Sequence, residues 1–185
     1  MMPQEMQCYA KLQGVQRLFH QLAKMELPAP DWIESSAPEA YRRVCRLAVK
    51  YDKSQRAVQV GFRQKQSQAL VEIDGCPVLT PTLSALIAPL RSMLNTLSTY
   101  RDVGHIELYD TESGLAMLVR HNGKPTAKDK DLMLAFAQQQ QCALYLQTTD
   151  APFALTEETP CFYKLNDLTL HYRPGDFLQV NKAVN

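Results

Sequence analysis

The segment HYRPGDFLQVNKAVN, residues 171–185, carries side chains whose types and spacing suit the binding of a ligand. A Pro-Gly-Asp turn at 174–176 leads into alternating apolar and amide residues, among them Phe177, Gln179 and Asn181. An amide can donate and accept hydrogen bonds at the polar edge of a ligand, and an exposed aromatic ring can stack on an unpaired base. The segment therefore reads as part of a binding site. The alternative places Phe177 in a core and Gln179 at an ordinary exposed strand position.

A second set of candidate residues is cationic and follows Tyr41. Apolar residues at every second position predict a strand, with one face made of Cys45, Leu47, Val49 and Tyr51. The other face carries Arg42, Arg46 and Lys50, and Arg43 lies beside them in sequence. Guanidinium groups match phosphate oxygens because they present a planar fork of donors. This face is a candidate nucleic-acid contact, and the alternative is a solvated strand face. Further cations would widen it if the fold gathers them: Arg63, Lys65, Arg120 and Lys124.

Short motifs that place phosphates, catalytic metals or nucleophiles are absent from the sequence. It contains no GxGxxG, GKS, GKT, HExxH or GxSxG. The 4 histidines are far apart, so we expect surface or structural roles for them. The 5 cysteines are scattered without a CxxC pair, which argues against a disulfide framework and a self-contained zinc site. The residues alone therefore identify no set of catalytic side chains.

Composition sets broad limits on the class of protein. The 185 residues are 45% hydrophobic and 21% charged, as in an ordinary globular chain of one domain with an appended arm. A net charge of +1 gives no global sign of a nucleic-acid partner, so such a contact needs a local patch of Lys and Arg. No apolar run is long enough to span a bilayer, and the first residues lack the apolar core of a signal peptide. We therefore expect a cytoplasmic chain with no membrane partner.

The periodicity of apolar residues predicts the elements of the first half. A helix is expected from about Gln4 to Lys24 and should end before the Pro-Ala-Pro at 28–30. After the strand that follows Tyr41, a second strand around Val58–Phe62 should pair with it antiparallel, and a third is expected at 69–73. Thr80 followed by Pro81 predicts the start of a helix, which Pro89 should bend or split.

The second half repeats the pattern of a strand pair followed by a helix. A hairpin is expected from 105–109 and 115–121, joined by a loop at 110–114. Thr126 with Asp129 resembles a capping box that begins a third helix, with Leu132, Ala135 and Phe136 facing inward. Short strands follow at 143–147, 162–165 and 168–172. Hairpins that alternate with single helices predict an α+β fold, an antiparallel sheet of hairpins packed with two or three helices. Residues 1–30 would form an N-terminal helical arm and residues 41–173 the central α+β domain.

Five segments in unbroken order carry a resemblance to a known family. They are YRRVCRLAV, VQVGFRQK, LVEIDGCPVLTP, GHIELYDTESGLAMLVRH and RPGDFLQVNKAVN. Together they resemble the middle portion of the bacterial RNA (uracil-5-)-methyltransferases, most nearly the iron–sulfur enzymes that methylate a uridine of 23S ribosomal RNA. The resemblance extends over about residues 41–185. It implies that residues 174–185 begin a linker into an S-adenosylmethionine-binding domain that lies beyond the chain, so we expect the chain to be a piece of a longer enzyme.

The resemblance assigns binding roles to four residues of this chain. Gln179 occupies the position that contacts S-adenosylmethionine in the family, and Phe177 resembles the aromatic that meets RNA bases near the target uridine. Arg46 matches an arginine near the substrate RNA, with Arg42 and Arg43 as secondary RNA-binding candidates. 23S ribosomal RNA is the implied partner, and we expect no DNA.

The resemblance also gives Cys76 a role as a metal ligand. Cys76-Pro77 resembles the fourth cysteine ligand of a 4Fe-4S cluster, whose other three ligands have a C-x5-C-x2-C spacing in the family. Thiolates suit such clusters because each iron needs one soft external ligand. The other three ligands have no match in residues 1–40. We therefore expect that this chain alone binds neither the cluster nor S-adenosylmethionine stably.

The implied reaction of the whole enzyme forms 5-methyluridine. In the family a cysteine adds to carbon 6 of a flipped-out uracil, and carbon 5 takes the methyl group from S-adenosylmethionine. A base then removes the carbon-5 proton, and the bond between carbon 6 and the cysteine breaks in the elimination. That cysteine and base lie in the family's C-terminal domain, so no catalytic residue is assigned here and the chain alone is expected to be inactive. Two alternatives remain open: a piece of a transfer-RNA (uracil-5-)-methyltransferase, which the DGCP segment disfavours, and a non-enzymatic RNA-binding or interaction module.

Overall fold

The computed structural model of the chain describes residues 3–30, 37–67, 69–149, 151–157 and 159–184. The chain divides into two compact units, residues 1–38 and residues 39–183. The first unit holds α1 (Gln4–Ala23), which confirms the predicted N-terminal helix. Lys24 ends this helix in the left-handed conformation, and its N–H bonds the carbonyl of His20. No described residue of α1 is buried.

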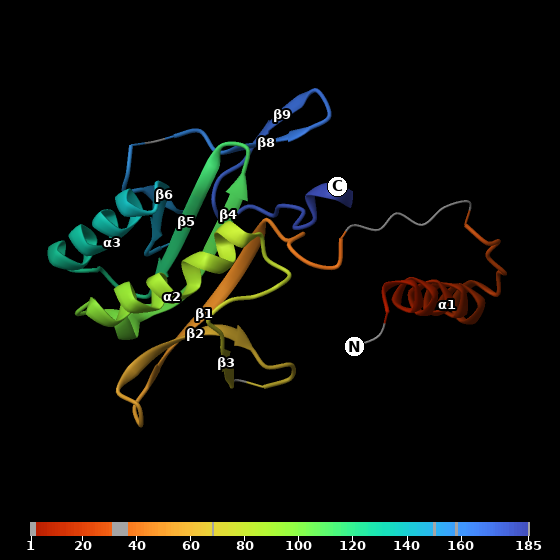
Figure 1. The fold of residues 1–185 in the computed structure, drawn as a ribbon, viewed down its shortest axis with the longest axis horizontal. Coiled ribbons are helices and arrows are strands. Elements are labelled where there is room, and N and C mark those ends of the chain that lie inside the picture. Colours follow the sequence, from red (N-terminus) through yellow and green to blue (C-terminus); the bar gives the residue numbers. More distant parts are fainter. Residues whose placement is uncertain (1–2, 31–36, 68, 150, 158, 185) are drawn as a thin grey trace. The chain divides into compact units, whose positions relative to one another are not determined.

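The second unit is built on a seven-stranded sheet in the order β3-β2-β1-β4-β5-β6-β7 (Figure 1). Its strands are β1 (Val44–Asp52), β2 (Ala57–Arg63), β3 (Leu70–Glu72), β4 (Val103–Thr111), β5 (Gly114–His121), β6 (Cys142–Gln147) and β7 (Phe153–Ala154). β5 and β6 pair in parallel, because α3 (Ala127–Gln139) connects them as a crossover, and the other neighbouring strands of the sheet pair antiparallel. β8 (Phe162–Leu165) and β9 (Leu168–His171) form a separate hairpin. The α+β class with a mostly antiparallel sheet is confirmed.

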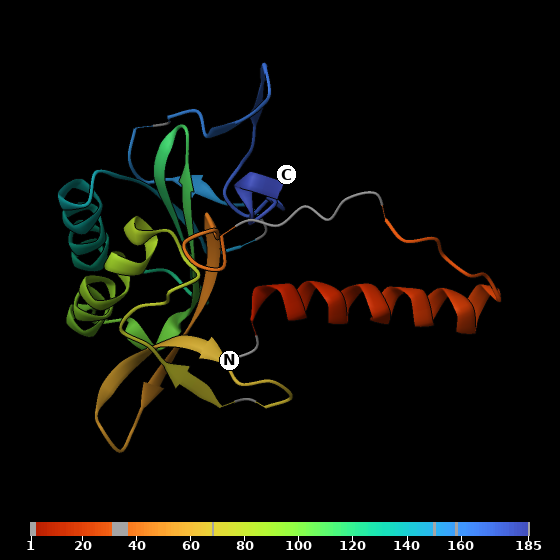
Figure 2. The same cartoon turned by 45° about the vertical axis from the view of Figure 1, so that its right-hand side comes forward.

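Two helices cover one face of the sheet, α2 (Pro81–Thr96) and α3 (Figure 2). α2 begins as predicted, because the Thr80 side chain accepts a hydrogen bond from the N–H of Leu83. The main core lies between these helices and the sheet. It includes Leu47 of β1 and Ile106 of β4, both fully buried, and the apolar stripe of α2, namely Leu83, Leu86, Ile87, Leu90 and Leu94. This burial is the main source of the unit's stability.

A second, smaller core lies on the opposite face of the sheet. It gathers residues of β4, β5 and β6 with the C-terminal segment: Tyr109, Ala116, Leu118, Tyr145, Cys161, Tyr172 and Leu178. Figure 2 shows that segment on the side of the sheet away from α2 and α3. β5 is therefore covered on both faces over Ala116–Val119, which explains its continuous apolar run. The rest of the sheet face opposite the helices is free to carry polar side chains.

Three details of the helices and strands differ from the sequence predictions. Ala135 of α3 is exposed and Met133 is buried in its place, because Met133, Phe136 and Ala137 form the stripe that meets the sheet. Pro89 does not split α2, which runs unbroken from Pro81 to Thr96. The two-residue strand β7 was not predicted, because an isolated pair of residues carries no periodicity.

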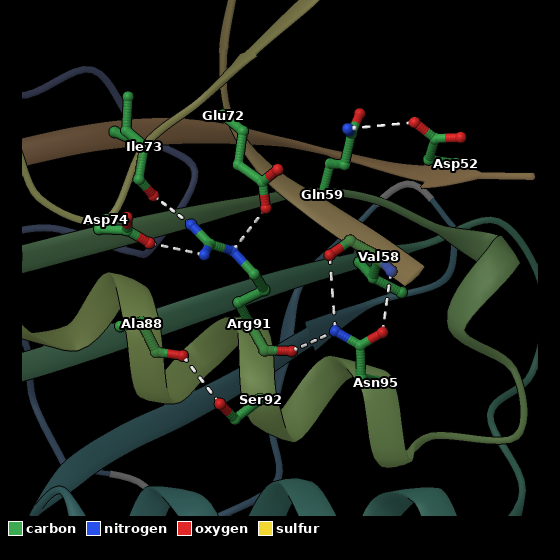
Figure 3. A network of polar contacts seen from close by, with 10 residues as sticks. All are labelled: Asp52, Val58, Gln59, Glu72, Ile73, Asp74, Ala88, Arg91, Ser92 and Asn95. Carbon is green, nitrogen blue, oxygen red and sulfur yellow. Dashed lines mark hydrogen bonds and ion pairs between the residues drawn. The ribbon is translucent and has the colours of Figure 1, made fainter. Parts of the chain in front are cut away.

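Polar side chains of α2 hold the outer strands in place (Figure 3). Arg91 contacts the carboxylates of Glu72 at 2.9 Å and Asp74 at 2.7 Å, and it donates to the carbonyl of Ile73. Asn95 Oδ1 accepts a hydrogen bond of 2.8 Å from the backbone N–H of Val58. β3 pairs with β2 over Gly61–Arg63, so the Asn95 amide takes the place of a neighbouring strand at Val58.

Replacing Asn95 by alanine should lower the free energy of unfolding by about 1–2 kcal/mol, because the buried N–H of Val58 would lose its acceptor. Urea denaturation followed by circular dichroism measures this change. Ser92→Ala is the matched control on the same helix, since the Ser92 hydroxyl bonds the carbonyl of Ala88 within α2. Equal stability of the two variants would contradict the role given to Asn95.

Candidate functional site

The C-terminal segment forms a ledge against the sheet, which we define as residues 174–181. It begins in a tight turn, where Asp176 accepts a hydrogen bond from the N–H of Arg173 at 2.8 Å and donates its own N–H to the carbonyl of Arg173. Gly175 has a φ of 106°, which a side chain would disfavour. The N–H of Gly175 donates to the hydroxyl of Tyr109 at 2.7 Å. The turn is therefore fixed by its own residues and by β4.

The side chains of the ledge alternate between the core and the surface. Leu178 is buried in the second core, whereas its neighbours Phe177 and Gln179 are exposed. Phe177 is 87% exposed, an unusual position for a large aromatic ring. The alternative that Phe177 belongs to the core of this chain is therefore wrong, and Gln179 lies at an exposed position close to it.

Arg43 lies beneath the surface and not among the exposed cations beside which it lies in the sequence. Its side chain is 2% exposed, and its Nε donates to the backbone carbonyl of Gln179 at 3.0 Å. Its guanidinium carbon lies 4.7 Å from the centre of the Tyr163 ring. The backbone N–H of Arg43 donates to the carbonyl of Val180. A direct RNA contact would need an exposed guanidinium, so this correction makes Arg43 part of the support of the ledge.

Arg46 lies on the exposed face of β1, as predicted. Its Nη2 lies 2.6 Å from Nε2 of His105, and its Nε lies 3.7 Å from Oε1 of Glu107. Glu107 stays ionised, because hydrogen bonds from His105 and Tyr109 hold the pKa of its carboxyl below the usual range despite partial burial. Arg46 is therefore held by side chains of β4 while more than half of it stays open to solvent.

Arg42 takes a different position from Arg46, although the two were predicted on one strand face. It precedes β1 and forms backbone bridges to Leu79 and Asn181, so it joins the start of the sheet to the ledge. Its side chain is half-buried, and its Nε is buried with no acceptor among the described residues. Its contribution to an exposed cationic surface is smaller than that of Arg46.

The strand registers gather several cations on the sheet face away from α2 and α3. Arg46 and Lys50 point to this face because Leu47 and Val49 between them are buried under the helices. Ala48 pairs with His105, which pairs with Arg120, so Arg120 lies on the same face of β5. We define Arg46, Lys50 and Arg120, all exposed, as the cationic face. Lys65 and Lys124 lie in loops.

Cys76 lies in a loop that α2 anchors from two sides. Its N–H donates to the hydroxyl of Ser84 at 2.9 Å, and Arg91 holds Asp74 two residues earlier. The thiol is half-buried and packs against the main core. Among the described residues, no three His, Cys, Asp or Glu side chains come together in a group that could hold a metal ion. The described residues therefore do not fit a four-cysteine cluster by themselves.

Sequence reasoning missed Tyr109 and Glu107, which join the ledge to the cationic face. Tyr109 is fully buried and donates from its hydroxyl to Oε2 of Glu107 at 2.5 Å. Burial, and then the Glu107 carboxylate, raise the pKa of Tyr109, so the hydroxyl stays protonated. The alternation in IELYD places both residues on one strand face, but it carries no sign that Gly175 lies across from them.

Comparison with solved structures shows that the fold resembles a known one. The fold matches part of the crystal structure of Pyrococcus abyssi tRNA (uracil-54, C5)-methyltransferase in complex with S-adenosyl-L-homocysteine, with a TM-score of 0.67 and 15% identity, over 96% of this chain and 45% of that one. At this identity the match shows the fold alone. No protein-family model matches the chain. Within the part of the chain that the structure describes, no helix is long and apolar enough to cross a membrane.

Several curated sequences have a much higher identity to this chain. The protein from Tolumonas auensis described as 23S rRNA (uracil(1939)-C(5))-methyltransferase RlmD is 72% identical over 185 residues, which are 100% of this chain and 42% of that protein. The protein of the same description from Aeromonas salmonicida is 48% identical over 177 residues, 95% of this chain and 40% of that protein. Over nearly its whole length the chain is therefore similar to part of proteins described as 23S rRNA (uracil(1939)-C(5))-methyltransferases. It spans about two fifths of the length of these relatives.

Proposed function

We propose that this chain is the RNA-binding central part of an S-adenosylmethionine-dependent methyltransferase that forms 5-methyluridine in 23S ribosomal RNA in the cytoplasm. The observation that carries the proposal is the ledge, because it presents an exposed ring and an exposed amide from a backbone fixed against the sheet. The relatives that are 72% and 48% identical to it over the aligned residues are described as enzymes of this activity. The transfer-RNA alternative has support from the fold alone.

The chain's own residues would divide the work of binding between two surfaces. The cationic face would contact phosphates of the RNA, since guanidinium and ammonium groups supply affinity that does not depend on sequence. Phe177 would stack on an unpaired base near the target uridine. Gln179 would contribute one polar contact to S-adenosylmethionine, the methyl donor, whose remaining contacts we assign to no residue of this chain. No catalytic nucleophile or base is assigned to the described residues.

The cluster-binding role of Cys76 stays a narrower proposal. We propose that its half-buried thiol offers one ligand, because the loop is pinned to α2 in a fixed position. Cys45 is less suited to this role, since burial raises the pKa of its thiol to about 12 and disfavours the thiolate that an iron ion needs. The other ligands have no counterpart among the described residues, so no reaction step is derived through the cluster.

Phe177→Ala should weaken the binding of RNA with an unpaired uridine by about 10-fold, within the usual range for loss of one stacked base. The probe is a short hairpin with a uridine in its loop, and the measurement is fluorescence anisotropy with the 185-residue chain. Binding of a fully paired duplex should be unchanged, because its bases are not available to stack.

Phe19→Ala is the matched control for this experiment. Phe19 is also an exposed aromatic, 43% exposed, but it lies on α1 in the first unit and not on the ledge. If both variants bind the hairpin like the unmodified chain, the ring of Phe177 is no RNA contact. If both variants weaken binding equally, the effect is general and the ledge has no special role.

A further inference from the structure

We propose that Tyr109 and Arg43 are positioning residues that hold the ledge in the conformation from which Phe177 and Gln179 act. The inference rests on the proposed function, because that function explains why the side chains of Phe177 and Gln179 are exposed. It differs from the roles implied by the family resemblance, since neither Tyr109 nor Arg43 would touch RNA or S-adenosylmethionine. Both act through the backbone of residues 175–180.

Tyr109 fixes the first part of the ledge with a directional pair of hydrogen bonds. Its hydroxyl donates its single hydrogen to Glu107 at 2.5 Å, which leaves its lone pairs to accept the N–H of Gly175 at 2.7 Å. An ionised carboxylate is the stronger acceptor for a hydroxyl, so Glu107 sets the direction of the Tyr109 O–H. The N–H of Gly175 therefore always faces an acceptor, and the turn before Phe177 has one preferred orientation.

Glu107 extends this connection to the cationic face. One of its oxygens, Oε2, accepts from Tyr109, while Oε1 lies 3.7 Å from Nε of Arg46 and 3.5 Å from Nε2 of His105. A continuous series of polar contacts thus runs from Arg46 through Glu107 and Tyr109 to Gly175. The two proposed RNA-binding surfaces share one support.

Arg43 fixes the second part of the ledge and does so at an energetic cost. Its side chain is 2% exposed, and no described residue accepts a hydrogen bond from its buried Nη1 or Nη2. A buried guanidinium with unused donors destabilises a fold compared with an apolar side chain of similar size. What this charge does supply is the hydrogen bond from Nε to the carbonyl of Gln179 and the contact with Tyr163. Arg43 therefore holds the ledge in position but does not increase the stability of the fold.

Tyr109 and Arg43 lie next to each other at one end of the sheet, so they support the ledge together. Tyr109 pairs with Val44, the residue after Arg43, and the N–H of Asp110 donates to the carbonyl of Arg43. One residue holds Gly175 and the other holds Gln179 and Val180, so Phe177 lies between two fixed points. A segment held in its binding conformation loses less entropy when its ligand binds.

Native-state hydrogen exchange on the 185-residue chain tests this shared support. In each variant of one residue, the exchange rate is measured for the backbone amide whose hydrogen bond involves the other residue. Tyr109→Phe should speed exchange of the Arg43 amide, which donates to Val180, by about 10-fold. Arg43→Met should speed exchange of the Gly175 amide, which donates to Tyr109, by about as much. Amides of the Val49–Val60 pair, in the distant part of the sheet, should exchange as before.

Tyr51→Phe is the matched control, because it removes a tyrosine hydroxyl from the same sheet away from the ledge. Unchanged exchange at both contacts would overturn the proposal, and so would equal acceleration in Tyr51→Phe. Arg43→Met should also unfold at the same or a higher urea concentration, a result that a merely structural arginine would not give. A lower midpoint for Arg43→Met would overturn its role as a positioning residue.

RNA binding by the same variants separates this inference from the proposed function. Faster exchange together with an approximately 10-fold loss of affinity for the uridine hairpin supports both. Faster exchange with unchanged affinity supports the positioning of the ledge and overturns the RNA role of Phe177.

Discussion

An Asp129→Ala variant should unfold with a free energy about 3–4 kcal/mol lower than that of the unmodified chain, because its carboxylate is the buried acceptor of several donors. Asp129 is fully buried in the first turn of α3. Oδ1 accepts the N–H of Ser98 at 2.7 Å, and Oδ2 accepts the N–H of Thr99 at 3.1 Å and both of their hydroxyls. Removing the carboxylate would leave the donors of half-buried Thr99 and of exposed Ser98 without their acceptor.

The position of this carboxylate explains why its loss should affect the whole unit. Ser98 and Thr99 follow α2 and lead through the short helix η1 (Tyr100–Asp102) into β4. His121, at the end of β5, has its Nε2 3.0 Å from the Thr99 hydroxyl and joins the same network. Asp129 thus ties α3 to the chain between α2 and β4. Urea denaturation measures the loss, and Asp131→Ala, an exposed position on the same helix, is the control.

The acid dependence of stability provides an independent measure of the same carboxylate. Burial alone would raise the pKa of Asp129, but hydrogen bonds from Thr99 and Ser98 outweigh it and hold the pKa well below its usual range. The unfolded chain, with an aspartate pKa near 4, therefore takes up the proton first as the pH falls. This contribution to stability is complete above about pH 5 and decreases below about pH 4. Asp129→Asn should show a shallower decrease over that range, and an unchanged slope would contradict the assignment.

The triple variant Arg46→Gln, Lys50→Gln, Arg120→Gln should bind single-stranded RNA about 100-fold more weakly at physiological salt, because it removes the cationic face. The plot of log affinity against log salt concentration should also become shallower, by about 2 for three lost phosphate contacts. Anisotropy titrations at a series of salt concentrations measure both quantities.

A control for charge alone is available in the first unit of the chain. The control is a second triple variant that also removes three positive charges, all from exposed positions of residues 3–24. Its substitutions are Lys11→Gln, Arg17→Gln and Lys24→Gln. If the two triple variants lose affinity equally, the chain attracts RNA by net charge and the face on β1 and β5 has no special role. If neither loses affinity, the sheet is not an RNA-binding surface.

Local patterns in the sequence were sufficient to predict most of the helices and strands of this fold. The period of two in β1 predicted which residues are buried, since alternate side chains of a strand point to opposite faces whatever lies beyond them. Thr80 and Thr126 predicted the starts of α2 and α3, because a capping side chain bonds backbone groups of its own helix. The alternation in residues 177–179 likewise allowed Phe177 and Gln179 to share an exposed side of the ledge.

Only the tertiary structure decided which segments lie together and which charges stay on the surface. Arg43 and Arg46 have the same chemistry and lie three residues apart, yet the ledge covers one, and β4 leaves the other more than half exposed. The contact of Tyr109 with Gly175 joins residues 66 positions apart, which no local period can signal. By itself, the sequence determined the α-helices, most of the strands and the types of side chain that the proposed RNA-binding role would use. Their assembly into a site depended on burial across the sheet, which is a property of the whole packed chain.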